Sequence, residues 1–344
     1  MKKRFLFFVN VCTVISGVIG AGFATGQEIL LYFGGINPVL CAIFCVLFYF
    51  LFFYCAVLID YSDKKTKEKP ARFQIISKKI TNLFTEIACF VVLCAMLSAT
   101  KSILKDLFGG FWTTTLLGIV LALFCMVIVL TNNAGLKFVG VIFTTLFLLS
   151  FVIIVFFAED FTLLGNVKGS VSKSLLYVSL NSIFLTTLLA ESCADFKMTS
   201  KLLFCSICSL LCGLLIFFAI VCVNSCGFDT LPLLKIAFKN VCFGKFYSFL
   251  LLLGIVTTVV ASALPLVKRI DGRINCRILS TLLLFAIAWV VSLLDFGQIV
   301  EKFYPILSVF GVIIILMTLL NLLRFNKQGN RIKSLVPTDK GFFQ

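Results

Sequence analysis

An apolar stretch near the start of the chain carries residues that could bind a solute inside a membrane. Within about a dozen positions it combines four glycines with a hydroxyl, an amide and a carboxylate: Gly17, Gly20, Gly22 and Gly26, together with Thr25, Gln27 and Glu28. Glycine weakens a helix and exposes its backbone. An ionisable group at membrane depth is costly enough to indicate a functional role. We therefore predict that this helix is interrupted at Gly20, Ala21 and Gly22, and that a solute binds at the interruption.

The glycines allow two interpretations. Unwinding would free backbone N–H groups at the start of the outer half-helix, and this positive helix end favours an anion such as a carboxylate. Alternatively, Gly22 and Gly26 form a GxxxG pair that lets a neighbouring helix approach closely. The stretch alone supports both equally. A nucleotide-binding loop is excluded, because no strand precedes the glycines.

Glu28 is the carboxylate of this stretch. It follows Gly22 by six residues, which is about 9 Å along a helix and keeps it within the membrane. It could hold a substrate ammonium, exchange a proton or pair with a fixed cation, and a purely structural carboxylate is the alternative. Thr25 and Glu28 are accordingly predicted to contact the solute.

The composition requires a bilayer around these residues. The chain has 344 residues, of which 61% are hydrophobic and 13% charged, with a mean hydropathy of +1.13. Soluble domains are about 45–50% apolar and about 25% charged. The net charge of +15 is spread over short segments between apolar runs, so no nucleic-acid partner is expected. With no histidine, neither a zinc or haem site nor a histidine proton relay is expected.

A spanning helix needs about 20 mostly apolar residues. On that basis the sequence predicts an all-α polytopic membrane protein with ten spans: Phe5–Gly34, Pro38–Ile59, Ile80–Leu104, Phe111–Leu130, Leu136–Phe157, Leu175–Leu189, Leu202–Val223, Phe246–Leu266, Leu279–Leu294 and Tyr304–Leu323. Of the 30 lysines and arginines, 22 lie on the side of the two termini. The positive-inside rule then places both termini in the cytoplasm.

The long connections repeat with opposite orientation. Tyr61–Lys79 follows span two inside, and Asn224–Lys245 follows span seven outside. This pattern predicts one transporter domain over residues 1–344, built from inverted repeats of about 1–160 and 161–344, with a cytoplasmic tail at 325–344. Span six would then be interrupted like span one. The alternative is a continuous helix whose Ser and Thr side chains bond to their own turn. Cys226 and Cys242 both fall in the predicted outer loop and could form a disulfide, although the sequence favours two free thiols.

Span eight carries a candidate cation site. Gly254, Thr257 and Thr258 lie at positions i, i+3 and i+4, so one carbonyl and two hydroxyls share a helix face. Oxygen ligands of this kind suit a small cation. Hydroxyls in membrane helices also commonly bond to the backbone, which is the competing interpretation.

The motif VIGAGFATGQEIL, followed by FGG, resembles the first span of the YkvI-like bacterial membrane proteins, which resemble the amino acid–polyamine–organocation superfamily. The resemblance implies a leucine-transporter-type fold with helices one and six unwound at the midplane. It also implies that three groups of residues form the site: the amides of Gly20, Ala21, Gly22 and Phe23 for a carboxylate; Ser16 and Ile19 with Gly254, Thr257 and Thr258 for sodium; and Tyr177 and Asn181 of span six. This chain departs from the pattern because span six lacks a glycine.

Together with the resemblance, these features predict a secondary active transporter of a small organic solute, an amino acid or related amine, in the (inner) membrane of a bacterial cell. It would work by alternating access, coupled to sodium, to protons or to neither ion. The alternative is a membrane sensor or assembly protein that keeps the fold without transporting. No nucleophile–base pair or paired carboxylates favour an enzyme. No cofactor is expected apart from sodium, and the oligomeric state is left open.

Overall fold

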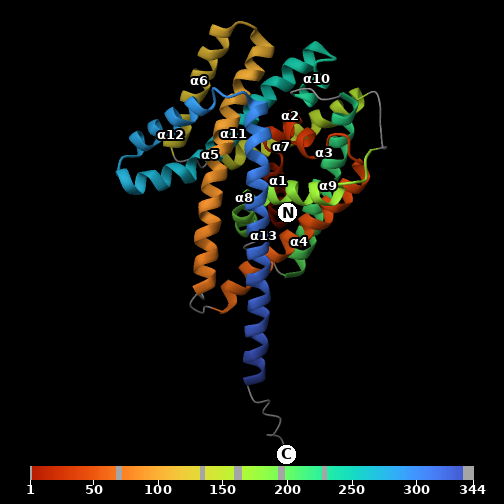
Figure 1. The fold of residues 1–344 in the computed structure, drawn as a ribbon, viewed down its shortest axis with the longest axis vertical. Coiled ribbons are helices and arrows are strands. Elements are labelled where there is room, and N and C mark those ends of the chain that lie inside the picture. The colour runs from red at the N-terminus through yellow and green to blue at the C-terminus, as the bar shows by residue number, and fades with distance from the viewer. Residues whose placement is uncertain are drawn as a thin grey trace, which may run out of the picture.

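The structure, a computed structural model, describes residues 2–66, 72–131, 136–158, 165–192, 198–226 and 231–335. In these ranges the chain forms helices and connecting turns, with one isolated bridge between Ile36 and Asn166. The helices are α1 (Lys2–Val18), α2 (Ala21–Thr25), α3 (Gln27–Phe33), α4 (Pro38–Thr66), α5 (Arg72–Phe108), α6 (Phe111–Leu130), α7 (Leu136–Phe157), α8 (Ser170–Ser192), α9 (Met198–Cys226), α10 (Pro232–Ala237), α11 (Val241–Ile274), α12 (Arg277–Val291) and α13 (Phe296–Leu335) (Figure 1).

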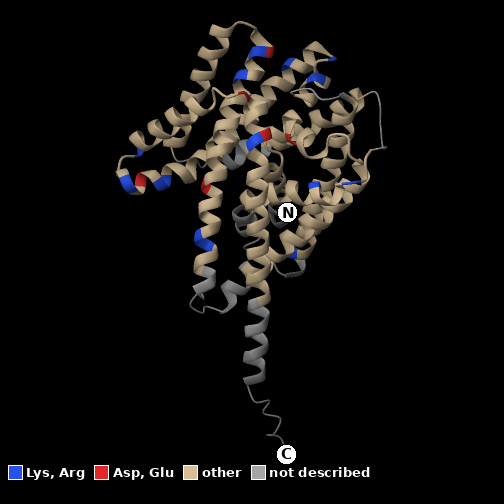
Figure 2. Ribbon diagram, in the orientation of Figure 1, with Lys and Arg blue, Asp and Glu red and all other residues tan. Residues whose placement is uncertain are grey.

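The helices have the length and surface of a polytopic membrane protein. Six segments in the described ranges are long and apolar enough to cross a bilayer: Pro38–Ile59, Ile75–Phe108, Phe111–Leu130, Ser200–Ser225, Val241–Ile274 and Phe296–Leu323. Three shorter helices, Phe7–Val18, Ile142–Phe157 and Arg277–Val291, are also apolar. Large apolar side chains such as Trp112 and Phe156 remain largely exposed, at 78% and 81%. Charged residues gather at helix ends, for example where α11 turns into α12 (Figure 2).

Helices lie at each of the ranges predicted from the sequence, and α6 and α7 have the predicted bounds. The helix of the last span is longer than predicted, because α13 continues through the expected tail as far as Leu335. Residues 336–344 lie outside the described part of the chain. The short helix α10 was not predicted, since its six residues are too few to register as an apolar span.

The first span is interrupted near the predicted position, but Ala21 and Gly22 are helical and belong to α2. α1 ends at Val18, Ile19 and Gly20 are not helical, and Gly20 is extended with φ −72° and ψ 170°. A second interruption follows at Gly26, which has a φ of +85° between α2 and α3. An L-residue rarely adopts this left-handed conformation, so glycine is needed there. The first span therefore consists of three short helices.

The predicted interruption in span six is wrong for the described residues, since α8 is continuous from Ser170 to Ser192. Three of its polar side chains instead bond within the helix. The hydroxyls of Ser179 and Ser182 donate to the carbonyls of Leu176 and Ser179, and Asn181 donates to the carbonyl of Tyr177. With no glycine or proline in α8, these bonds satisfy the polar groups without unwinding the backbone.

Close contacts pack α8 between α4 and α13. Gly311 of α13 lies against the backbone carbonyl of Ser179, where a Cβ atom would overlap that oxygen. The Ser179 hydroxyl also donates to the carbonyl of Ser308, at 2.8 Å. α4 packs along α8 on the other side and against α9, where Gly213 admits the side chain of Val46. α8 is thus a central helix of the described bundle.

Of the two outer-loop cysteines, the structure describes the side chain of Cys242. Cys242 is exposed at the start of α11 and has a free thiol. The side chain of Cys226 lies outside the described residues.

Candidate functional site

A cavity of about 420 Å³ lies beside the interruption between α1 and α2. α1 and the residues after it supply one wall, and α5, α7, α8, α11 and α13 supply the others. Eight of the predicted site residues line it: Ser16, Ile19, Gly20, Gly22, Glu28, Asn181, Thr257 and Thr258. The structure thus brings together residues from three segments far apart in the sequence.

The interruption leaves backbone groups available at the cavity wall. The amide of Ile19 still bonds to the carbonyl of Ile15, and the amide of Ala24 bonds to that of Gly20. Between these two bonds, the amides of Gly20, Gly22 and Phe23 have no hydrogen-bond acceptor among the described residues. The carbonyls of Ser16 and Ile19 likewise accept no bond from that part of the chain. Non-helical backbone at membrane depth is tolerated where it lines a cavity.

Glu28 reaches back from α3 to the interruption. Its carboxyl group lies directly against Gly22, where the Cβ of any other residue would overlap Oε1. The residue is 7% exposed and lines the cavity. No Lys or Arg of the described chain forms an ion pair with it. A buried carboxylate without a Lys or Arg partner favours the binding of a cation.

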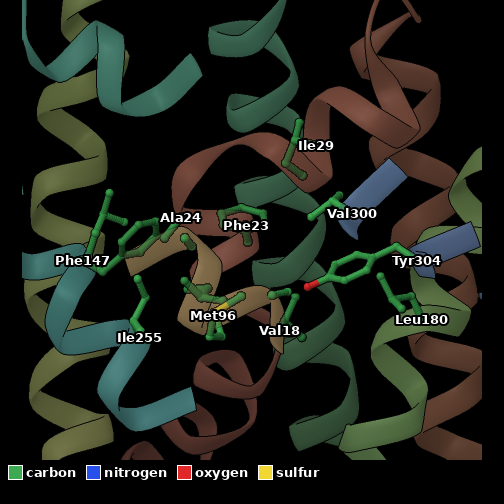
Figure 3. Close-up of a cluster of buried hydrophobic side chains, with 14 of the residues drawn as sticks. Val18, Phe23, Ala24, Ile29, Met96, Phe147, Leu180, Ile255, Val300 and Tyr304 are labelled. Carbon is green, nitrogen blue, oxygen red and sulfur yellow. The ribbon is translucent and has the colours of Figure 1, made fainter. Parts of the chain in front are cut away.

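Four tyrosines surround Glu28 within electrostatic reach: Tyr32 on α3, Tyr49 on α4, Tyr177 on α8 and Tyr304 on α13. The Tyr32 hydroxyl shares a hydrogen bond of 2.5 Å with Ser308. Tyr304 lines the cavity and directs its hydroxyl toward Val18, the last residue of α1 (Figure 3). These neighbours are polar but uncharged, so Glu28 is left as the centre of negative charge.

α11 presents hydroxyls to the opposite wall. Thr257 and Thr258 both donate to the carbonyl of Gly254, each at 2.8 Å. A carbonyl oxygen has two lone pairs, so Gly254 is fully engaged, whereas the two hydroxyl oxygens keep theirs. Gly254 lies away from the cavity because the ring of Phe143 fills the space beside it. The predicted cation set therefore depends on Thr257 and Thr258 rather than on the Gly254 carbonyl.

Three predicted site residues pack elsewhere. Phe23 is fully buried between Phe147 and Phe151 of α7. Thr25 donates its hydroxyl to the carbonyl of Gly22, which helps to fold the short helix α2. Tyr177 packs its ring on Tyr32 and Phe33 and is absent from the cavity wall. The side chain of Ala21 lies outside the described residues.

The sequence did not identify several residues of the cavity wall. α5 contributes Thr85, Cys89 and Met96, α7 contributes Phe143, and α13 contributes Tyr304. They lie within long apolar runs, where no motif distinguishes a wall residue from a lipid-facing one. Only the rotation of each helix decides this, and rotation follows from packing.

No protein-family model and no curated protein sequence matches this chain. Solved structures do match. A point variant of the manganese transporter of Eremococcus coleocola has a TM-score of 0.55 at 15% identity, covering 93% of this chain and 79% of that one. The same transporter in complex with an aromatic bis-isothiourea substituted compound has a TM-score of 0.53 at 14% identity, covering 94% and 80%. At this identity the likeness establishes the fold, which is that of a membrane transporter.

Proposed function

We propose that the protein is a secondary active transporter of a small organic solute that carries an ammonium group, such as an amino acid or a related amine. One observation carries the proposal: Glu28 is the only charged residue of the described cavity wall, and it lies at a helix interruption. Its carboxylate would hold the ammonium. In an amino acid, the amides of Gly20 and Gly22 would bind the carboxylate.

The proposed topology has ten spans in two inverted repeats, about 1–160 and 161–344, with both termini in the cytoplasm of a bacterial cell. Helices at all ten predicted ranges and the strong bias of Lys and Arg support it.

In this orientation the cavity lies on the cytoplasmic side of the interruption. Thr13 precedes it on α1, and Pro265 lies toward the cytoplasmic end of α11. Alternating access would require a second packing in which the site opens outward.

The first-span resemblance to YkvI-like proteins supports a leucine-transporter-type arrangement with a cation between helices one and eight. The carbonyls of Ser16 and Ile19 and the hydroxyls of Thr257 and Thr258 are the oxygen atoms that would bind sodium. All four residues line the same cavity. Proton coupling through Glu28 is the other arrangement that the cavity supports.

Manganese is the substrate named for the structural neighbours, so the cavity is compared with the needs of that ion. Mn²⁺ favours carboxylate, carbonyl and water ligands. The chain has no histidine, and no three His, Cys, Asp or Glu side chains gather anywhere in its described ranges. One carboxylate among hydroxyls suits an ammonium better than a divalent metal.

The experiment is a thermal-unfolding screen of the purified full chain with L-alanine, L-lysine, ethanolamine, putrescine or Mn²⁺, each with and without Na⁺. A ligand that binds only the folded protein raises its unfolding temperature. Hits are then tested for counterflow in proteoliposomes. Glu28→Gln should abolish the shift, whereas Glu301→Gln, at an exposed position on α13, should keep it.

If Mn²⁺ is the only compound that stabilises the protein, the substrate is a metal ion and not an amine. Binding of an amine without counterflow would instead favour the non-transporting sensor. If no compound shifts unfolding and none is exchanged, the proposal is wrong.

A further inference from the structure

A line of protic side chains runs between α4 and α8, separate from the cavity along most of its length. We call it the protic stripe, and its members are Cys41, Cys45 and Tyr49 on α4 and Ser170, Ser174, Tyr177 and Asn181 on α8. Their spacings of three or four residues place each set on one helix face. The two helices pack against each other, and every member is buried, with at most 6% exposure.

Neighbouring members of the stripe contact each other across the interface. The Ser174 hydroxyl donates to the Cys41 carbonyl at 3.2 Å. Its side chain also lies near the thiols of Cys41 and Cys45. Further along, Tyr49 interacts electrostatically with both Cys45 and Tyr177. The groups therefore form a succession rather than isolated polar residues.

The stripe connects a surface of the protein with Glu28. At one end, Ser170 follows Lys168 and Gly169, which are exposed. At the other end, Asn181 lines the cavity, and Tyr177 interacts electrostatically with Glu28. Asn181 follows Ser170 by 11 positions, which is about 16 Å along the helix. This is about half of a bilayer core of about 30 Å.

Two hydroxyls in the stripe have no structural explanation. Tyr49 and Tyr177 are fully buried, and neither hydroxyl has a partner in hydrogen-bond geometry in the described structure, although the Asn181 side chain lies near that of Tyr177. Leaving such a group unpaired destabilises the folded protein. Phenylalanine would fill the same space without this cost. A hydroxyl can both donate and accept a hydrogen bond, which is what proton transfer requires.

We propose that the protic stripe conducts protons between the outer surface at Ser170 and the carboxylate of Glu28. The proposal rests on the transporter function proposed above and specifies its coupling ion. A hydronium ion at the outer end gives up one proton. Each hydroxyl, thiol or bridging water passes one proton on and accepts one in return. The Glu28 carboxylate takes the last proton and becomes a neutral acid, and water in the cavity removes that proton on the other side.

The surroundings of Glu28 suit this exchange. The titratable groups facing it are Tyr32 from its own helix, Tyr49 from α4, Tyr177 from α8 and Tyr304 from α13. α9 adds Cys212, which interacts with Tyr49 and Tyr177. Within the described ranges no fixed cation holds Glu28 in its charged form. Protonation would therefore release a cationic solute from the site.

The experiment measures proton flux into proteoliposomes of the full chain, using a trapped pH-sensitive dye and a potassium diffusion potential. We expect flux above that of protein-free vesicles in the unaltered protein. Tyr49→Phe with Tyr177→Phe should reduce it at least tenfold, and Glu28→Gln should abolish it. The control is Tyr54→Phe, which alters a tyrosine of the same helix that stacks on Phe50 outside the stripe. It should leave the flux unchanged.

The variants must first unfold at a temperature close to that of the unaltered protein, which shows that they are folded. If the double variant unfolds, Ser174→Ala gives the same test with a smaller change, and Ser150→Ala on α7 is its control. Counterflow of the solute, which needs no proton gradient, is measured in the same vesicles. Counterflow without proton flux, or flux that is equal in the stripe variants, overturns the proton path alone. Absence of counterflow overturns the transporter function instead.

Discussion

The carboxyl group of Glu28 occupies the space in which Gly22 would carry a side chain. Six residues separate the two in the sequence, and the turn at Gly26 folds α3 back so that they meet. The close contact bears on both interpretations of the first-span glycines. Gly22 is needed for close packing, and its packing partner is the acidic side chain of the site rather than a neighbouring helix.

Gly22→Ala should therefore displace Glu28 and lower the free energy of unfolding by about 1–3 kcal/mol, as overpacking does. Gly20→Ala is the matched control for stability, because a Cβ at Gly20 meets nothing within 4 Å. Thermal unfolding of the two variants tests this. In the double variant with Glu28→Ala, most of the loss should be recovered, since the overlapping atoms are gone. Equal unfolding temperatures for Gly22→Ala and Gly20→Ala would contradict the contact.

Gly26→Ala should destabilise the protein more than Gly35→Ala. Both glycines have a positive φ, +85° and +70°, so both substitutions carry the strain of a left-handed residue, about 1–2 kcal/mol. Only at Gly26 would the Cβ also meet Pro232 and Leu233 of α10, at 2.7 and 2.9 Å. Chemical unfolding of the two variants measures the difference. Equal losses of stability in the two variants would mean that α10 shifts to make room for the added Cβ atom.

The sequence predicted the elements of the fold better than their rotation. Apolar length alone located the helices, and glycine chemistry located the interruption after Val18. The interruption of span six was inferred from symmetry, and it failed because Ser179 and Ser182 bond within α8. Polar groups in an apolar span signal unwinding only when their own turn cannot satisfy them.

The site was predicted from the first span, and the cavity wall from α5 and α13 was missed. Met96 and Tyr304 face the cavity only because their helices are rotated by contacts with α8 and α11. Such contacts join residues far apart in the chain. A single sequence contains no signal for them.

Thr257→Val and Thr258→Val test the cation site on α11. Together they should remove any stabilisation of the protein by Na⁺, because valine keeps the shape and deletes the oxygen. Within the described structure each hydroxyl bonds to Gly254 of its own helix and to no other group, so little stability should be lost otherwise. Thr318→Val on α13 deletes an equivalent bond, to Ile314, and serves as the control. Sodium-dependent unfolding that persists in the double variant would move the ion to another site.

Gly311→Ala tests whether α8 is held rigidly against α13. A Cβ at this position would overlap the backbone carbonyl of Ser179, and a backbone atom cannot rotate away as a side chain can. The helices would have to separate, which would also strain the bond from Ser179 to Ser308. We expect a loss of about 1–3 kcal/mol in the free energy of unfolding. Gly272→Ala, where the added Cβ meets nothing within 4 Å, should by contrast be neutral or stabilising, because alanine favours a helix. If Gly311→Ala unfolds like Gly272→Ala, α13 can shift along α8, and the two helices form a sliding contact rather than a fixed one.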